Sequence, residues 1–296
     1  MAVQEAAAVL RDAGVATETF ETSRPGSGGV LALEAMRQGF DTILACGGDG
    51  TVHEILQSLV GTDVALGVLP LGTANALATD LGLIGPPAKV ARALLHAVPV
   101  RVPVGRIHFQ DKDGNRASRY FTVAAGIGVD ALLMSRLDAD LKRRFGYIVY
   151  LVEAFRIWAT ASFPFFEAAF TSNGSDVPRV AEVSQLLAVR VRSFGGVLRE
   201  LAPGATLRNG TLRLLAFRTR SRFRYLKFLL AVMAGRHTFS DAVELLDTHW
   251  VECHARNGSQ AAIFAEADGE FLGCLPVRIE VAHEPLTLLI TPHAQP

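Results

Sequence analysis

Two short apolar segments in the first third of the chain each end in a glycine-containing turn, and a helical pattern follows each turn. Residues 42–46 run into the turn at 47–51, and residues 65–69 run into the turn at 70–75. Apolar runs of this length, bounded by glycine and followed by helices, are typical of buried parallel strands. Neighbouring parallel strands end at the same edge of a sheet, so the two turns are expected to line one crevice.

The first turn, Gly47-Gly48-Asp49-Gly50-Thr51, has the composition of an anion-binding turn. Glycine lets the backbone approach a phosphate with no Cβ in the way, and the following helix N-terminus offers N–H groups and a positive dipole end. Asp49 in the middle of such a turn suits a metal ligand or an orienting group. A tight turn without a ligand is the alternative interpretation.

Several common catalytic and nucleotide-binding patterns do not occur in the sequence. There is no GxxxxGK[ST] loop, neither glycine cluster follows GxGxxG, and there is no GxSxG elbow. His53, His249 and His254 lack the spacing of helical zinc ligands, so we interpret them as surface or satisfied histidines. Cys46 is interpreted as a small buried residue, and residues 26–29 as a surface loop.

After about residue 98 the pattern changes to short β-rich segments separated by turn residues. We predict an α/β N-terminal domain with an open, mostly parallel sheet at residues 1–100, and a C-terminal antiparallel β-sandwich with short helices at residues 101–296. The first is expected to contain helices at 2–13, 30–38, 51–60 and 88–97 and strands at 15–20, 42–46 and 65–69. The second is expected to contain strands at 101–109, 120–124, 165–171, 182–192, 211–218, 249–254, 261–265, 277–281 and 286–290, and helices at 141–158 and 225–233.

The charges of the 296 residues cancel, with 29 Lys and Arg against 29 Asp and Glu. We therefore expect no nucleic-acid partner. The mean hydropathy of +0.28 is high, but the longest uncharged run, residues 64–79, contains Gly, Pro and Asn and is shorter than the ~20 apolar residues of a membrane span. No secretory signal pattern occurs at the N-terminus, and three widely spaced cysteines favour a cytoplasmic location.

Basic and acidic residues are unevenly distributed in the second half of the chain. Residues 208–227 hold seven basic side chains and no acidic one, whereas residues 240–270 hold seven acidic side chains against one arginine. Aromatic and apolar residues alternate with the basic ones, as in segments that bind anionic lipid. The residues proposed for that contact are Arg218, Arg220, Arg222, Arg224 and Lys227. The other interpretation is that the basic and the acidic segment are two solvent-exposed faces without a lipid partner.

A second group of carboxylates lies at residues 266–270. On an extended chain Asp268 and Glu270 point to the same side, and Gly269 lets the backbone bend between them. Two carboxylates on one side suit the removal of a proton from a hydroxyl group. Asp-Gly is also a common β-turn pair, so the pattern alone is a weak indication.

Together these motifs resemble the diacylglycerol kinase-like catalytic domain family, which includes bacterial lipid kinases, diacylglycerol kinases, sphingosine kinases and ceramide kinase. The motifs occur in the family's order: GGDGT at 47–51, PLGTAN at 70–75, GIGVDA at 126–131, LKRRFGYIVY at 141–150, GG and APGA within 195–205, and DGE at 268–270. The resemblance spans nearly the whole chain, although GGDG alone is shared with the NAD kinases. It implies a nucleotide-binding N-terminal domain, ATP and Mg²⁺ in the cleft, and transfer of the γ-phosphate to a lipid hydroxyl.

The resemblance also implies roles for individual residues. The expected ATP contacts are Thr22, Gly47, Gly48, Asp49, Gly50, Thr51, Val52, His53, Thr73 and Asn75. Asp49 is expected to act in catalysis and in the metal network. Glu270, with Asp268 beside it, looks like the general base that takes the proton of the lipid hydroxyl. Asp130 lies where sphingosine kinases hold the polar head of the acceptor, which makes it the expected substrate contact.

The chain also departs from the family pattern. It begins inside the helix that should follow a first strand and an Asn-Pro-x-Ser-Gly phosphate loop, so we expect that N-terminal part to be missing. Ala76 and Pro103 replace two aspartates that hold Mg²⁺ through water in bacterial diacylglycerol kinases. Because sphingosine kinase-like sequences share part of this loss, diacylglycerol and sphingoid bases both remain expected acceptors. Val123 replaces a family Asn, and Asn209 replaces an Asp that often binds a structural cation.

The leading hypothesis is an ATP-dependent lipid kinase that acts at a membrane surface, peripheral at the inner membrane face. A NAD kinase-like enzyme is one alternative, which the APGA and DGE blocks disfavour. A kinase homologue that binds nucleotide or lipid with weak turnover or none is the other. The oligomeric state is left open by the sequence.

Overall fold

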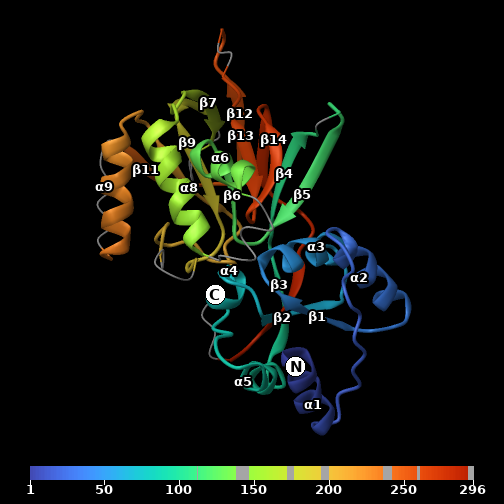
Figure 1. The fold of residues 1–296 in the computed structure, drawn as a ribbon. Helices are drawn as coiled ribbons and strands as arrows, with labels where there is room; N and C mark the ends of the chain where they lie inside the picture. The colour runs from blue at the N-terminus through green and yellow to red at the C-terminus, as the bar shows by residue number, and fades with distance from the viewer. Residues whose placement is uncertain are drawn as a thin grey trace.

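The computed structural model shows a molecule of two lobes (Figure 1). It describes residues 1–111, 113–137, 147–171, 177–194, 200–235, 242–258 and 261–292. Residues 141–146, which belong to an expected helix and family motif, and the glycines of the GG motif lie outside the described residues. Within the described part of the chain, no helix is long and apolar enough to cross a membrane.

The sheet of the first lobe is mostly parallel, as the sequence predicts. Its strand order is β1 (Thr42–Gly47), β2 (Ala65–Pro70), β16 (Leu286–Ile290) and β3 (Val98–Val102), and only the β16–β3 pair is antiparallel. Its helices are α1 (Ala2–Asp12), α2 (Ser27–Arg37), α3 (Asp49–Leu59), α4 (Ala76–Asp80) and α5 (Pro87–Leu94). Figure 1 shows α2 and α3 on one side of this sheet and α1 and α5 on the other. Burial from both sides explains why β2 is almost entirely apolar.

Several expected strands differ from the structure. Those at 101–109, 120–124 and 182–192 are each divided between two strands, and two others differ more. Residues 15–20 form no strand and are mostly exposed, because their short alternation of apolar and polar residues meets no sheet edge to pair with. The strand at 286–290, which the sequence pattern groups with the sandwich, lies in the first sheet as β16. Periodicity identifies a strand, but it does not identify the partner of that strand.

The glycines at 26–29 do not form a surface loop, because α2 begins within them. The Glu54 carboxylate accepts hydrogen bonds from the Gly26 N–H at 2.7 Å and the Gly28 N–H at 2.9 Å. A carboxylate at a helix N-terminus satisfies unpaired N–H groups and stabilises the helix through its dipole. Glu54 lies on α3, so this contact also fixes α2 against α3.

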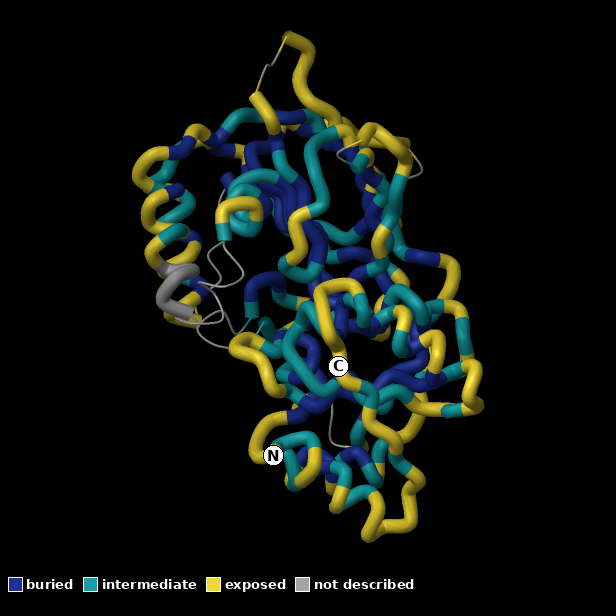
Figure 2. The backbone as a smooth tube through the Cα atoms, turned by 45° about the vertical axis from the view of Figure 1, so that its right-hand side comes forward, coloured by how far each residue is buried: buried dark blue, intermediate teal, exposed yellow. Residues whose placement is uncertain are grey.

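The second lobe is an antiparallel β-sandwich, which confirms the predicted fold class. Its strands are β4 (Gly105–Gln110), β5 (Arg116–Phe121), β6 (Ala124–Ile127), β7 (Phe166–Phe170), β8 (Arg179–Val183), β9 (Gln185–Val189), β10 (Leu212–Phe217), β11 (Val243–Thr248), β12 (Trp250–Ala255), β13 (Phe264–Ala267), β14 (Glu270–Cys274) and β15 (Val277–Val281). One sheet has the order β11-β10-β9-β6-β13-β14 and the other the order β5-β4-β15-β12-β7-β8. The apolar core between them contributes to the dark blue interior in Figure 2. The helices α6 (Val129–Arg136), α8 (Tyr147–Thr160) and α9 (Arg222–Met233) lie outside the sheets.

A buried arginine ties the connection between the lobes to the sandwich. Arg190 is 0% exposed, and its guanidinium donates hydrogen bonds to the carbonyl oxygens of Pro103, Leu207, Asn209 and Thr211 at 2.6–2.9 Å. Burial lowers the pKa of Arg190 to about 10, so the group is still charged at neutral pH. The guanidinium therefore brings a positive charge to the turn that contains Asn209, where the family resemblance implies a cation-binding aspartate.

Candidate active site

The two glycine turns meet at the carboxyl edge of the first sheet. Gly47 lies beside Pro70 in the strand register, and the Leu71 N–H donates to the Gly47 carbonyl at 2.9 Å. A Cβ on Gly72 would lie 2.5 Å from the Cα of Gly48, so a side chain at this position would force the two backbones apart. The turns thus form one continuous backbone surface at the N-terminus of α3.

Two side chains hold these turns in place. Asn75 has a left-handed φ of +50°, and its side chain accepts a hydrogen bond from the Gly72 N–H at 2.9 Å and donates one to the Gly72 carbonyl at 2.7 Å. Asp49, the first residue of α3, accepts a hydrogen bond from the Ala76 N–H at 2.7 Å. Asn75 is therefore engaged within its own turn, whereas Asp49 connects the two turns.

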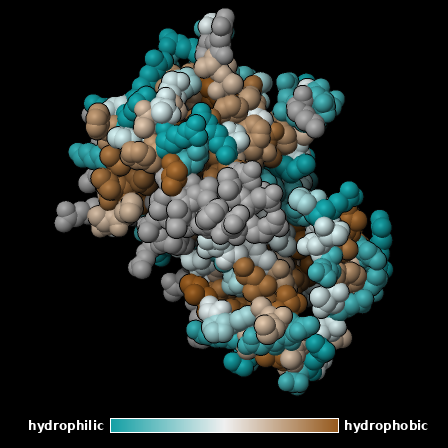
Figure 3. Space-filling view, viewed as in Figure 1, coloured by the Kyte–Doolittle hydropathy of each residue, from teal (hydrophilic) through white to brown (hydrophobic). Residues whose placement is uncertain are grey.

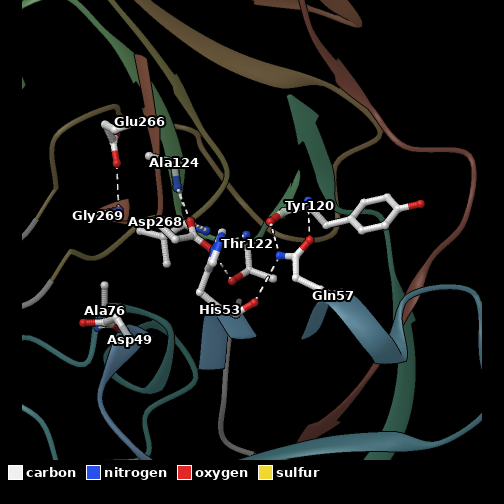
Figure 4. Close-up of polar contacts among 11 residues, drawn as sticks. Asp49, His53, Gln57, Ala76, Tyr120, Thr122, Ala124, Glu266, Asp268 and Gly269 are labelled. Atoms are coloured by element: carbon white, nitrogen blue, oxygen red, sulfur yellow. Dashed lines mark hydrogen bonds and ion pairs between the residues drawn. The ribbon is translucent and has the colours of Figure 1, made fainter. Parts of the chain in front are cut away.

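The predicted base, Glu270, is the first residue of β14, directly after the turn that joins β14 to β13. Asp268 and Gly269 both have positive φ, +49° and +83°, so the chain reverses sharply there. The Asp268 carboxylate accepts hydrogen bonds from the backbone N–H groups of Thr122, Val123 and Ala124 at 2.8–3.1 Å (Figure 4). Its side chain is only 3% exposed. Asp268 therefore anchors this turn to the segment between β5 and β6.

Glu270, in contrast, is exposed. Its Oε1 atom lies 3.2 Å from the place where a Cβ on Gly50 would stand. Gly50 belongs to the first turn of α3, where the backbone N–H groups lack partners within the helix. The Glu270 carboxylate thus lies beside the N-terminus of α3, next to the glycine turns.

Helix α3 connects the glycine turns to the turn that carries Glu270. The buried His53 places its Nδ1 3.6 Å from the Asp268 carboxylate, a charge contact when the imidazole is protonated. The Gln57 side chain accepts a hydrogen bond from the Tyr120 N–H at 2.9 Å and donates one to the Tyr120 carbonyl at 2.8 Å (Figure 4). One helix therefore sets the distance between the two halves of the site.

The remaining predicted nucleotide contacts differ in exposure. Thr73 is exposed on the second turn, and Thr51 is partly exposed on α3. Val52 and His53 are buried, so their side chains face the interior and not the crevice. Thr22 is exposed in the connection between α1 and α2, and the strand expected before it is not formed.

The expected substrate residue, Asp130, lies in the first turn of α6. Its Oδ1 atom is buried and has no hydrogen-bond partner in the described structure. Burial raises the pKa of Asp130 to about 7, although the backbone N–H groups of Ala131 and Asp130 and the neighbouring Glu266 oppose the shift. Burial and the negative charge of Asp130 raise the pKa of Glu266. A second acid therefore lies against the expected substrate residue.

Sequence reasoning missed three side chains that build this site: Glu54, Gln57 and Glu266. Glu54 and Gln57 contact the backbone of another segment, and Glu266 contacts the backbone of Gly269 in its own hairpin; such contacts leave no periodic signal in the sequence. Glu54 and Gln57 could have been noted only as polar positions on the helix after GGDGT. Glu266 had one signal, its place two residues before the acidic turn.

Two family models together cover most of the chain. The model described as diacylglycerol kinase catalytic domain matches residues 1–107, and the model described as YegS C-terminal NAD kinase beta sandwich-like domain matches residues 122–290. The chain belongs to the diacylglycerol kinase-like family. The enzymes of this family are phosphotransferases with an alcohol group as acceptor.

Curated relatives in this family are similar over nearly the whole chain. A Chromohalobacter salexigens protein named "Probable lipid kinase YegS-like" is 33% identical, with 90% of this chain and 82% of that protein covered. A diacylglycerol kinase of Mycobacterium tuberculosis is 29% identical, with 89% and 81% covered. A solved structure described as a Bacillus anthracis diacylglycerol kinase has a TM-score of 0.63 at 18% identity, with 93% and 85% covered, and this likeness supports the fold.

The described residues do not form a metal site by themselves. No group of three or more His, Cys, Asp or Glu side chains among them is arranged to hold a metal ion. Alanine occupies position 76, directly after the second turn, so Asp49 is the acidic side chain that the two turns supply. One carboxylate is nevertheless consistent with Mg²⁺, which enzymes commonly bind through one or two carboxylates together with substrate phosphates.

Proposed function

We propose that this protein is an ATP-dependent lipid kinase that transfers the γ-phosphate of ATP to a hydroxyl group of a membrane lipid. The observation that carries this proposal is the position of Glu270, whose exposed carboxylate lies against the first turn of α3, where the two glycine turns meet. A phosphate bound by the backbone of these turns would lie within reach of an acceptor held by Glu270.

In this mechanism the glycine turns and the N-terminus of α3 bind the phosphates of ATP. Glu270 accepts the proton of the acceptor hydroxyl while the oxygen of that hydroxyl forms a bond to the γ-phosphorus. The bond between the γ-phosphorus and the β–γ bridging oxygen breaks, and ADP leaves. Asp268 positions Glu270 through its three backbone hydrogen bonds and does not itself take the proton.

Magnesium, when bound with ATP, would neutralise the charge on the transferred phosphoryl group, and Asp49 is the residue of this chain that would hold it. The hydrogen bond from the Ala76 N–H fixes the Asp49 carboxylate at the meeting point of the turns. The position of its carboxylate therefore favours Asp49 as the magnesium ligand, although Ala76 and Pro103 replace two other aspartates of the family pattern.

A cavity in the second lobe supports a lipid acceptor. It has a volume of about 400 Å³ and lies beside the start of α6. Leu132, Pro164, Ile263 and Phe264 are among its apolar lining residues, and Arg136, Thr160 and Ser184 are among its polar ones. Pockets of this size commonly bind small molecules through apolar walls. The first turn of α6 also carries Asp130, so we propose that this region receives part of the acceptor lipid.

The reaction can be tested with purified protein, radiolabelled ATP and mixed micelles that contain either diacylglycerol or sphingosine, with NAD in buffer as a third acceptor. Label in one of the lipids supports the proposal and identifies the acceptor class. Label in NAD alone would assign the chain to the NAD kinase-like alternative. ATP binding without label in any acceptor would assign it to the homologues that bind without turnover.

The helices α8 and α9 form an apolar and basic face that we propose lies against the membrane. They are held together near Trp158, whose indole N–H donates to the Arg222 carbonyl at 3.0 Å. Figure 3 shows hydrophobic side chains gathered over this part of the second lobe. The large exposed apolar residues described on the two helices are Val152, Phe155, Phe223, Leu229, Leu230 and Met233. Apolar contact together with basic charge is the pattern of interfacial helices.

The basic residues proposed from the sequence divide by their contacts. Arg218 makes an ion pair with Glu244 at 3.7 Å, and Arg220 stacks over the Phe165 ring at 4.5 Å. Arg222 donates to the carbonyls at the end of α8, so its replacement would disturb the packing of the two helices. Arg224 and Lys227 are exposed on α9 and are the residues to test.

The double substitution Arg224→Glu and Lys227→Glu is expected to weaken binding to phosphatidylglycerol vesicles at least about 30-fold at low salt. Each basic residue contributes about 1 kcal/mol near an anionic surface, and reversal adds repulsion. Vesicle co-sedimentation measures the change. The control is Arg116→Glu with Arg119→Glu, an equal change of charge at exposed positions of β5. Equal binding by the two double variants would remove α9 from the membrane contact.

A further inference from the structure

Glu266 is the penultimate residue of β13, and its exposed fraction is 6%. Its Oε2 atom accepts a hydrogen bond from the Gly269 N–H at 2.7 Å (Figure 4). Gly269 lies between Asp268 and Glu270, in the part of the turn where φ is positive. The Glu266 carboxylate therefore holds the backbone from which the proposed base projects.

The other oxygen of Glu266 lies beside Asp130. A Cβ on Gly126 would overlap the Asp130 carboxylate and would lie 2.7 Å from Glu266 Oε1, so both acids pack against the same stretch of β6 backbone. The two carboxyl groups therefore lie close together beside Gly126. Two carboxyl groups can share a hydrogen bond only if one of them is protonated.

The surroundings of the pair favour a retained proton. The titratable groups near it among the described residues are Asp268 and Glu270 on the same turn and Tyr225 from α9. The first two are acidic, and burial together with the charge of Asp130 raises the pKa of Tyr225, so that the phenol stays neutral. His53 from α3 faces Asp268 and not the pair. Backbone N–H groups of Ala131 and Asp130 oppose the shift at Asp130, but none of the described side chains that act on these two pKa values is cationic.

We propose that Asp130 and Glu266 hold one proton between them, and that this proton-linked pair positions the turn that carries Glu270. Glu266 is thus a positioning residue for the reaction, acting through the Gly269 N–H. The pair also gives Asp130 a partner within the protein in addition to the acceptor contact that the family resemblance implies. The role in the reaction rests on the proposed function of Glu270, whereas the shared proton does not.

The pH dependence follows from the direction of the pKa shifts. Both carboxyl groups have raised pKa values in the folded protein, that of Asp130 to about 7, so the folded state retains a proton that the unfolded chain releases near pH 4. The stability from the pair is therefore present in full below about pH 4 and is lost as the pH rises through about 7. Above that pH the two carboxylates repel each other, and the turn should loosen.

The test compares the full-length wild type with Glu266→Gln, Glu266→Ala and the control Glu284→Gln, an exposed acid elsewhere. The Gln side chain can accept from the Gly269 N–H and donate to Asp130 without a shared proton. We expect the Tm of the wild type and the control to fall between about pH 4 and 8 and the Tm of Glu266→Gln to fall less. We expect kcat at pH 7 to drop about tenfold or more in Glu266→Ala and to stay within about threefold in Glu266→Gln, with the alkaline decline of kcat reduced.

The two readouts separate this proposal from the proposed function. Thermal unfolding needs no substrate, so a Tm profile of Glu266→Gln that follows the wild type would overturn the shared proton even if transfer were intact. Full kcat in Glu266→Ala would overturn the positioning role. If the wild type transferred no phosphate but the Tm profiles differed as expected, the shared proton would stand and the kinase assignment would fail.

Discussion

Replacement of Glu270 by Gln is expected to lower the rate of phosphate transfer by at least about 100-fold, because a positioned general base contributes a factor of this order. Gln keeps the size of the side chain but cannot take the proton of the acceptor hydroxyl. Glu270 is exposed, so the free energy of unfolding is expected to change by less than about 0.5 kcal/mol. The loss should therefore appear in kcat at unchanged stability.

The measurement is initial-rate transfer from radiolabelled ATP to the lipid that the wild type prefers, with thermal unfolding recorded on the same preparations. Glu284→Gln is the matched control, since it removes an exposed carboxylate between β15 and β16. A Glu270→Gln variant with the wild-type rate would exclude Glu270 as the base. Retained ATP binding in this variant would show that the glycine turns are intact.

The first sheet and its turns could be predicted because their signal is local. An apolar strand, a glycine turn and a helix occur in direct succession at β1 and β2, and the carboxyl edges of parallel strands bring the two turns together. The close approach of Gly48 and Gly72 follows from this arrangement, since neither residue carries a Cβ. The position of Asp49 at that meeting point was therefore within reach of sequence reasoning.

The parts that could not be predicted depend on contacts between distant segments. β16 has the pattern of any apolar strand, and only its pairing shows that it completes the first sheet. Asp268 lies 144–146 residues from the N–H groups that hold it, and nothing near Thr122 in the sequence indicates this contact. The family resemblance pointed to Asp268 and Glu270 together, but only the structure assigns one an anchoring position and the other an exposed one.

Asp49 has two separable duties in the proposed mechanism, and two substitutions distinguish them. The carboxylate accepts the hydrogen bond from the Ala76 N–H, and its charge is proposed to hold Mg²⁺ with ATP. Asp49→Ala removes both, and we expect transfer to fall by at least about 100-fold together with weaker ATP binding. Asp49→Asn keeps an oxygen that can accept from Ala76 but carries no charge.

For Asp49→Asn we expect ATP affinity near that of the wild type and a rate of transfer as low as that of Asp49→Ala, because the connection between the turns survives while the charge does not. Calorimetric titration with ATP measures the first quantity, and transfer over a range of Mg²⁺ concentrations measures the second. Raised Mg²⁺ should restore part of the rate if the carboxylate acts through the metal. A wild-type rate in Asp49→Asn would instead limit Asp49 to joining the two turns, and Mg²⁺ would then be held by the phosphates of ATP without this carboxylate.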